Sequence, residues 1–174
     1  MRALIAGLLL ALFLALPEAA AADGRHADPQ LEALLPATLG GVVLIRESQR
    51  GTDLMTSNAV FDGFLASLNK GREDFLVGSA YSNGGLKAAV SSWQVKGADS
   101  DKLFSGFKAT IQASSKVELS ISVETLSGQK VTRISDPGQL AQGPIYAYAD
   151  GDTVFFVQTP DRDLAKEALG KLPH

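Results

Sequence analysis

The sequence predicts an α+β protein, in which an antiparallel sheet of about seven strands carries helices mainly on one of its faces. Three observations lead to this class. Short β-prone runs follow one another in pairs, turn-forming residues join the runs of each pair, and a few longer segments show apolar residues at helical spacing. Consecutive strands of this kind favour antiparallel pairing, because a tight turn can connect only antiparallel neighbours.

The strongest signal is a hairpin within residues 145–158. Its two runs, I-Y-A-Y-A and T-V-F-F-V-Q, flank the dipeptide Asp150-Gly151, and such a dipeptide tolerates the positive φ angles of a tight hairpin turn. The second run is apolar at successive positions, so both of its faces are apolar, which is typical of a strand covered on both sides. We therefore expect residues 153–158 to form a buried strand near the middle of the sheet.

The N-terminal part of the predicted domain begins with a short helix. Asp28 suits the N-cap of this helix and Pro29 its first position. The apolar run 42–45 predicts the first strand, and the polar stretch 48–58 predicts a loop. At the other end of the chain, an acidic start near Asp161 and apolar residues at helical spacing predict a final helix.

An internal repeat organises the middle of the chain. The segment F-D-G-F-L-A-S-L at 61–68 recurs as F-S-G-F-K-A-T-I at 104–111. Apolar residues fall at helical spacing in both segments, and we attribute the glycine in each to a close approach of the helix to the sheet. Two strand-like runs follow each segment: 75–81 and 86–95, then 117–126 and 130–134. The pattern favours a duplicated helix-plus-hairpin unit, and a chance resemblance of two amphipathic helices is the alternative.

The elements from run 42–45 through run 117–126 follow the order βαββαβ, which is the ferredoxin-like order. Such an order carries no function by itself. Within residues 117–124 apolar and polar side chains alternate, which is typical of a strand with one face in water. The apolar set is Val117, Leu119, Ile121 and Val123, and the polar set is Glu118, Ser120, Ser122 and Glu124.

The first residues predict export. Met1-Arg2 precedes the apolar run 3–16, and small residues occupy 19–22, as in a secretory signal peptide. The run is shorter than the roughly 20 apolar residues that span a bilayer, and an uncleaved anchor is the alternative. We expect residues 1–22 to be the signal peptide and residues 23–174 a single α+β domain. Its location would be secreted or periplasmic, that is, extracytoplasmic, without membrane association after cleavage.

Composition argues against several classes of function. The chain has no cysteine, so it has no disulfide and no thiolate metal site. Its net charge is −3 and its basic residues are scattered, which argues against a nucleic-acid partner. The two histidines, His26 and His174, lie near the ends of the expected domain and cannot support a Ser-His-Asp triad. We expect no metal and no cofactor.

Close pairs of aspartates leave two alternatives open. Carboxylates of this kind could bind calcium, or could act as the acid and base of a hydrolase. Their positions at helix starts and in the hairpin turn also explain them structurally. The pairs are Asp99/Asp101, Asp150/Asp152 and Asp161/Asp163.

The predicted binding surface is the solvent-facing side of the sheet, with Tyr146, Tyr148, Trp93, Ser120 and Ser122 as its candidate residues. Tyrosine and tryptophan among serines suit contact with a protein or a glycan, although a place in the core is the more common one for such aromatics. We therefore predict a secreted, non-catalytic binding or interaction module of unknown ligand. The alternatives are a carboxylate-based hydrolase, a calcium-dependent extracellular protein, and a structural component of an envelope or larger assembly.

Overall fold

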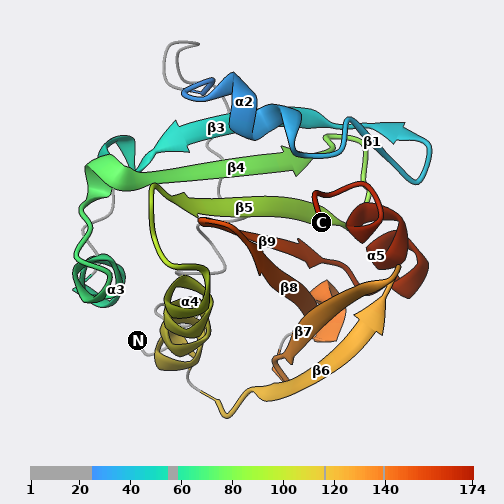
Figure 1. The fold of residues 1–174 in the computed structure, drawn as a ribbon. Coiled ribbons are helices and arrows are strands. Elements are labelled where there is room, and N and C mark those ends of the chain that lie inside the picture. Colours follow the sequence, from blue (N-terminus) through green and yellow to red (C-terminus); the bar gives the residue numbers. More distant parts are fainter. Residues whose placement is uncertain (1–24, 55–58, 116, 139) are drawn as a thin grey trace, which may run out of the picture.

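The protein is described by a computed structural model, which covers residues 25–54, 59–115, 117–138 and 140–174. The predicted signal peptide, residues 1–22, lies outside the described residues. The described chain is an α+β fold that contains a seven-stranded antiparallel sheet (Figure 1), as the sequence predicted. Among the described residues, the helices are too short or too polar to cross a membrane.

The main sheet has the strand order β3-β4-β5-β9-β8-β7-β6, and all neighbours are antiparallel. Its strands are β3 (Ile45–Arg50), β4 (Phe75–Tyr81), β5 (Ala89–Val95), β6 (Ser120–Leu126), β7 (Gln129–Ser135), β8 (Ile145–Asp150) and β9 (Thr153–Gln158). A separate two-stranded sheet pairs β1 (Thr38–Leu39) with β2 (Val42–Val43). β3 corrects the prediction of a loop from residue 48, because this strand continues through the polar residues up to Arg50.

The C-terminal hairpin confirms the strongest sequence prediction. β8 and β9 pair from Ile145↔Gln158 to Asp150↔Thr153, and Gly151 in the turn has a φ of +56°. β9 also pairs with β5 on its other side, so it lies at the centre of the sheet. Val154 and Phe156 face one side of the sheet, Phe155 and Val157 face the other, and all four side chains are buried.

Helices start where acidic caps predicted them. Asp28, Asp99 and Asp161 accept hydrogen bonds from backbone N–H groups in the first turn of the helix that follows each of them. The helices are α2 (Pro29–Ala33), α3 (Ala59–Ser67), α4 (Ser100–Ser114) and α5 (Arg162–Leu169), and short 3-10 turns occur at Gly51–Asp53, Arg72–Asp74 and Leu140–Gln142.

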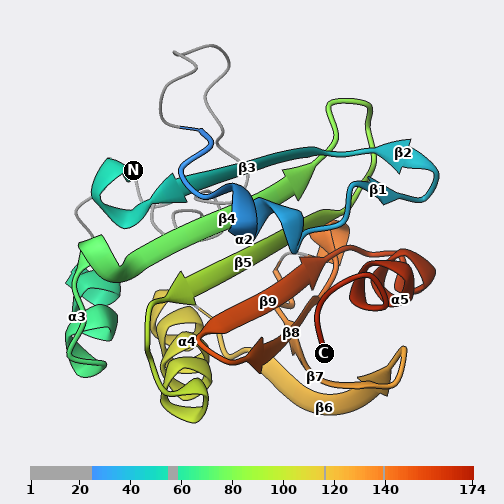
Figure 2. The same ribbon diagram turned by 45° about the horizontal axis from the view of Figure 1, so that its top comes forward.

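The described helices lie on both faces of the sheet, which corrects the expectation that they would gather mainly on one (Figures 1 and 2). α3 and α4 contact each other on one face, and their core contains Phe64, Phe107 and Trp93. α2 and α5 cover the other face, where Leu31 and Leu169 are buried. Neither face of the central strands is therefore open to solvent.

The ferredoxin-like order is not confirmed. That order places the second strand of the hairpin between the two strands that flank the first helix, whereas β3 pairs directly with β4. The duplication also stays a prediction. α3 is followed by the hairpin β4–β5 and α4 by the hairpin β6–β7, but the first hairpin lies in one half of the sheet and the second at the opposite edge.

The sheet curls so strongly that β6 and β7 bend away from the plane of the other strands (Figure 1). The curled end wraps around α5, because Leu126 of β6 and Val131 of β7 share a core with Ala165 and Leu169 of that helix. Two polar contacts hold the tip of the hairpin in the same place. Ser127 Oγ donates to the carbonyl of Lys166 at 2.6 Å, and Arg162 reaches Glu124 at 2.6 Å.

Candidate functional site

The aromatic residues of the predicted surface lie in the interior. Trp93 is 1% exposed, and Tyr146 and Tyr148 are each 3% exposed. The Trp93 ring packs against Phe107 with a centroid distance of 5.3 Å. Tyr148 stacks on Phe155 at 5.6 Å, and its hydroxyl donates to the carbonyl of Pro173 at 2.6 Å. Because helices cover both faces of the central strands, these aromatics belong to the core and cannot form an external contact surface.

Ser120 and Ser122 are exposed, but the structure does not bring them together with the aromatics. Both lie on β6, the strand at the edge of the sheet. Ser122 pairs with Arg133 on β7, and Arg133 pairs with Tyr146 on β8, so a full strand separates the serine from the tyrosine. The five predicted site residues therefore do not form one site.

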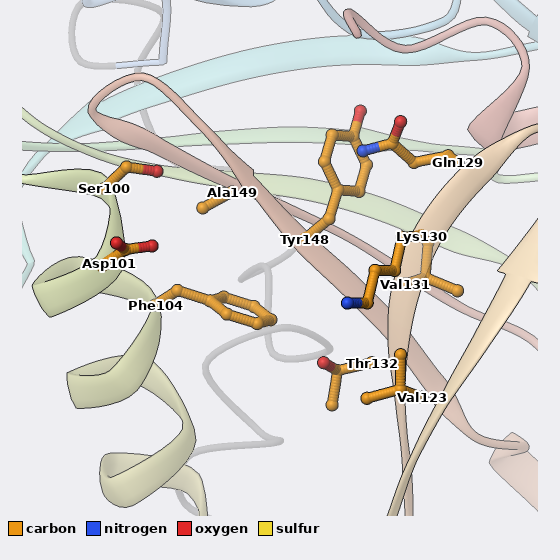
Figure 3. A pocket seen from close by; sticks show the side chains of 10 residues that line it. All are labelled: Ser100, Asp101, Phe104, Val123, Gln129, Lys130, Val131, Thr132, Tyr148 and Ala149. Carbon is orange, nitrogen blue, oxygen red and sulfur yellow. The ribbon is translucent and has the colours of Figure 1, made fainter.

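The structure instead contains a pocket of about 190 Å³ between the start of α4 and the strands β6, β7 and β8 (Figure 3). The ring of Phe104 and the ammonium group of Lys130 point toward each other across it. Its lining combines hydroxyl, charged, aromatic and aliphatic side chains. The lining residues are Ser100, Asp101, Phe104, Val123, Gln129, Lys130, Val131, Thr132, Tyr148 and Ala149.

The pocket exists because β7 separates from β8. All six residues of β8 pair with β9, but only Ile145, Tyr146 and Ala147 pair with β7. If this register continued, Val131 would lie opposite Tyr148 and Lys130 opposite Ala149, and these four residues line the pocket. The packing of the hairpin β6–β7 against α5 explains the separation, since it draws this end of β7 away from β8.

Two opposite charges stand at the rim of the pocket. Asp101 and Lys130 are both exposed, and neither forms an ion pair with another residue in the described part of the chain. Of the other lining residues, Thr132 is buried and Phe104 is half-buried. Lys130 could bind an anionic group of a ligand, Asp101 a cationic group, and Phe104 an apolar part. Such a combination within one small volume is typical of a binding pocket.

Sequence reasoning did not identify this group of residues. Asp101 belongs to one of the acidic pairs and Phe104 to the repeat, but nothing in the sequence links either of them to Lys130. The link depends on the divergence of β7 from β8, which involves residues far apart in the chain. Thr132 and Lys130 do alternate along β7, which is the one local sign that both side chains face the same side of the sheet.

Four of the other aspartates of the close pairs, Asp99, Asp152, Asp161 and Asp163, have structural partners, and Asp163 binds Lys166 at 2.8 Å. Asp99 accepts from the backbone of Lys102 at 3.0 Å, and Asp161 accepts from the backbone of Asp163 at 2.8 Å. Asp152 accepts from the backbone of Gly97 at 2.9 Å and so fixes the β5–α4 connection to the hairpin turn. Within the described residues, no group of three or more His, Asp or Glu side chains is placed to hold a metal ion.

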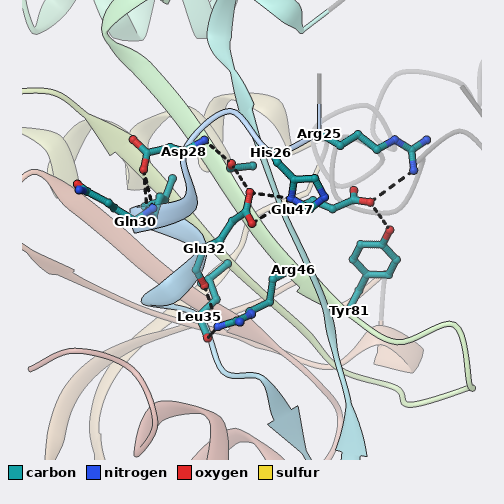
Figure 4. Close-up of polar contacts among 11 residues, drawn as sticks. Arg25, His26, Asp28, Gln30, Glu32, Leu35, Arg46, Glu47 and Tyr81 are labelled. Atoms are coloured by element: carbon teal, nitrogen blue, oxygen red, sulfur yellow. Dashed lines mark hydrogen bonds and ion pairs between the residues drawn. The ribbon is translucent and has the colours of Figure 1, made fainter. Parts of the chain in front are cut away.

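A second polar cluster surrounds β3 (Figure 4). On one face of the strand, Ser48 Oγ donates to Glu32 at 2.6 Å and accepts from the backbone of Asp28 at 2.7 Å. On the other face, the Tyr81 hydroxyl donates to Glu47 at 3.0 Å. Burial and this hydrogen bond raise the pKa of the Tyr81 phenol. These contacts join residues 25–28 and α2 to the sheet, so we assign the cluster a structural role.

Comparisons with known proteins identify no relative of this chain. No protein-family model matches it, and neither the curated proteins nor the solved structures include a significant match.

Proposed function

We propose that this protein is an exported, non-catalytic binding module and that its ligand site is the pocket between α4 and the diverging strands β7 and β8. The observation that carries the proposal is the convergence of Asp101, Lys130 and Phe104 on one pocket. The location replaces the open sheet face predicted from the sequence, because that face is covered by helices.

The chemistry of the lining favours a small zwitterion with a short apolar part. A carboxylate of the ligand would bind the Lys130 ammonium, and an amino group would bind the Asp101 carboxylate, since charged hydrogen bonds are the strongest of the polar contacts. An aliphatic side chain would lie against Phe104 and Val123. The volume of about 190 Å³ is below the range of drug-sized sites, so the ligand class is that of free amino acids or the end of a peptide.

The duplication, as a hypothesis, gives this pocket an origin. In the first unit, β4 pairs along its length with both β3 and β5. In the second unit, the hairpin β6–β7 pairs with β8 through only three residues of β7. A duplicated unit whose hairpin turned toward α5 would open a site that the first unit lacks.

Titration with L-leucine, followed by the amide resonances of ¹⁵N-labelled protein, tests the proposed site. We expect shifts at the pocket-lining residues with a millimolar dissociation constant, which corresponds to about −4 kcal/mol. N-acetyl-leucine keeps only the carboxylate and should depend on Lys130, whereas leucinamide keeps only the amino group and should depend on Asp101. Lys130→Ala should therefore weaken N-acetyl-leucine most, and Asp101→Asn should weaken leucinamide most.

Lys102→Ala is the matched control, because Lys102 is an exposed lysine of α4 that does not line the pocket. It should leave the binding of all three compounds unchanged. Absence of pocket shifts with all three at about 50 mM would refute the proposed ligand class, since such binding is weaker than any millimolar site.

Export is tested separately. Expression of the full chain followed by intact-mass analysis of the extracytoplasmic fraction should give a product that begins at Asp23, as cleavage after Ala22 predicts. A product that retains Met1 and stays with the cytoplasmic membrane would support the uncleaved anchor instead.

A further inference from the structure

The strand β6 is an unprotected edge of the main sheet. It pairs with β7 on one side and, within the described residues, with no strand on the other. Its side chains Ile121 and Val123 are 45% and 60% exposed although they lie on the face that carries α3 and α4. An exposed edge strand with apolar side chains is a template for pairing with another strand.

The opposite edge of the sheet is protected. Beside β3, the backbone of residues 25–27 forms a parallel bridge with Ser48: Ala27 N donates to the Ser48 carbonyl at 3.1 Å, and Ser48 N donates to the Arg25 carbonyl at 2.8 Å. β3 also carries the charged residues Arg46, Glu47 and Arg50. Bridging segments and charges are the usual protection of sheet edges. Residues Ser120–Val123 of β6 carry no charge, and no segment of the described chain bridges to them.

The sequence of β6 is complementary to itself. In an antiparallel pair of two β6 strands centred on Ser122, each Ile121 lies opposite Val123 of the second copy, and Ser120 lies opposite Glu124. Residues opposite each other in an antiparallel pair share a face, so the four aliphatic side chains form one cluster. We propose that two copies of this chain associate through β6 in this register and form one continuous sheet across a two-fold axis.

Charge and apolar pairing select this register over its neighbours. A pair centred on Ile121 would place Glu118 opposite Glu124 of the second copy, and like charges that oppose each other across strands are unfavourable. A pair centred on Val123 would place Ile121 opposite Thr125 and lose the aliphatic contact. Moving the centre by one residue changes each residue's partner by two positions. Such even changes keep the α3–α4 faces of both molecules on the same side of the joined sheet, because side chains alternate with a period of two.

The dimer should be weak. A single pair of strand edges is a small interface, and small interfaces are typical of transient association. We expect half-association at a concentration on the order of 10–100 µM, with a monomer at lower concentration. Val123 lines the ligand pocket as well, but the strand pairing needs no bound ligand, and Ser122, the position of the crosslink, does not line the pocket. Failure of the leucine titration therefore leaves this proposal unaffected.

Single cysteines in this cysteine-free chain test the register directly. At the two-fold axis, the Cα atoms of position 122 in the two copies would lie about 4.5–5.5 Å apart, which is within the range of a disulfide. Ser122→Cys in the full chain should therefore form a covalent dimer under mild oxidation. Ser120→Cys is the matched control, because its two copies would be roughly 13 Å apart at about 3.4 Å per residue.

Sedimentation velocity from about 5 to 500 µM tests the association itself. The dimer fraction should rise over this range, and Val123→Lys should raise the concentration of half-association at least about tenfold. Val43→Lys should leave it unchanged, because Val43 is 76% exposed on β2, outside the main sheet. A monomer at every concentration, or equal crosslinking of Ser120→Cys and Ser122→Cys, would overturn the proposal.

Discussion

Gly106 lies inside α4, at the point where the ring of Phe64 from α3 packs against it. A Cβ atom at position 106 would lie 2.7 Å from Cε2 and 2.8 Å from Cδ2 of Phe64, whereas carbon atoms in contact are normally about 3.5–4.0 Å apart. Phe64 is 5% exposed, and its ring lies 6.1 Å from that of Phe61 and 6.3 Å from that of Trp93. The ring therefore has little room to move away.

These contacts decide the sign of Gly106→Ala. In an open helix interior, alanine is favoured over glycine by about 1 kcal/mol. Insertion of a methyl group into a packed core costs about 1–3 kcal/mol, so we expect a loss of stability of up to about 2 kcal/mol. At Gly63, the equivalent residue of the first repeat segment, an added Cβ would meet no atom within 4 Å. Gly63→Ala should therefore stabilise the protein by about 1 kcal/mol.

Urea unfolding followed by the fluorescence of Trp93, the single tryptophan, measures both variants. The two free energies of unfolding should move in opposite directions and differ by about 1–3 kcal/mol. Phe64→Leu should restore part of the loss in Gly106→Ala, because a smaller side chain relieves the contact. If Gly106→Ala stabilises the protein as much as Gly63→Ala does, the proposed packing of α3 on α4 is wrong.

Three further predictions concern other parts of the fold. Burial, with a smaller effect of Asp150, raises the pKa of Tyr148 above its ordinary value of 10.0. The folded state therefore holds the phenolic proton of Tyr148 more tightly than the unfolded state does. The contribution of Tyr148 to the free energy of unfolding should be fully present below about pH 10 and should fall above it by up to about 1.4 kcal/mol per pH unit. Urea titrations at several pH values should show a shallower fall in Tyr148→Phe. Asp152→Ala removes the acceptor of Gly97 N and Gln94 Nε2 and should lower the unfolding free energy by about 1–3 kcal/mol, whereas Asp150→Ala, at the exposed side of the turn, should lower it much less. Ser48→Ala leaves Glu32 and the backbone of Asp28 without their buried partner and should lower the melting temperature by several degrees, as a loss of about 1 kcal/mol does in a domain of this size.

The parts of the fold that the sequence predicted correctly are encoded by neighbouring residues. The hairpin β8–β9 depends on Gly151 and on apolar runs directly beside it, and the starts of α2, α4 and α5 depend on one aspartate each. β3 was missed because its residues are polar. An edge strand needs polar side chains for protection, so its composition resembles that of a loop.

The glycine of the repeat shows how a correct observation can have a different cause. Gly106 does mark a close approach, but the neighbour is the Phe64 ring of α3 and not the sheet, and Gly63 marks none. The predicted site failed for a related reason. Alternation along β8 shows that Tyr146 and Tyr148 share a face, yet it cannot show that α5 and the C-terminal residues cover that face.

The proposed ligand pocket depends on residues that do not line it. Leu126 is buried in the core around α5, and burial of a leucine side chain contributes about 1.5–3 kcal/mol. Three further backbone pairs between β7 and β8 would be available if the hairpin β6–β7 lay flat against the sheet, and a hydrogen bond contributes about 0.5–1.5 kcal/mol net. These two contributions are therefore similar in size, and the contacts of Ser127 and Glu124 with α5 favour the open arrangement. The pocket is open because the hairpin β6–β7 packs against α5 and does not pair fully with β8. If the proposed ligand site is correct, substitutions on α5 should change ligand affinity although α5 does not line the pocket.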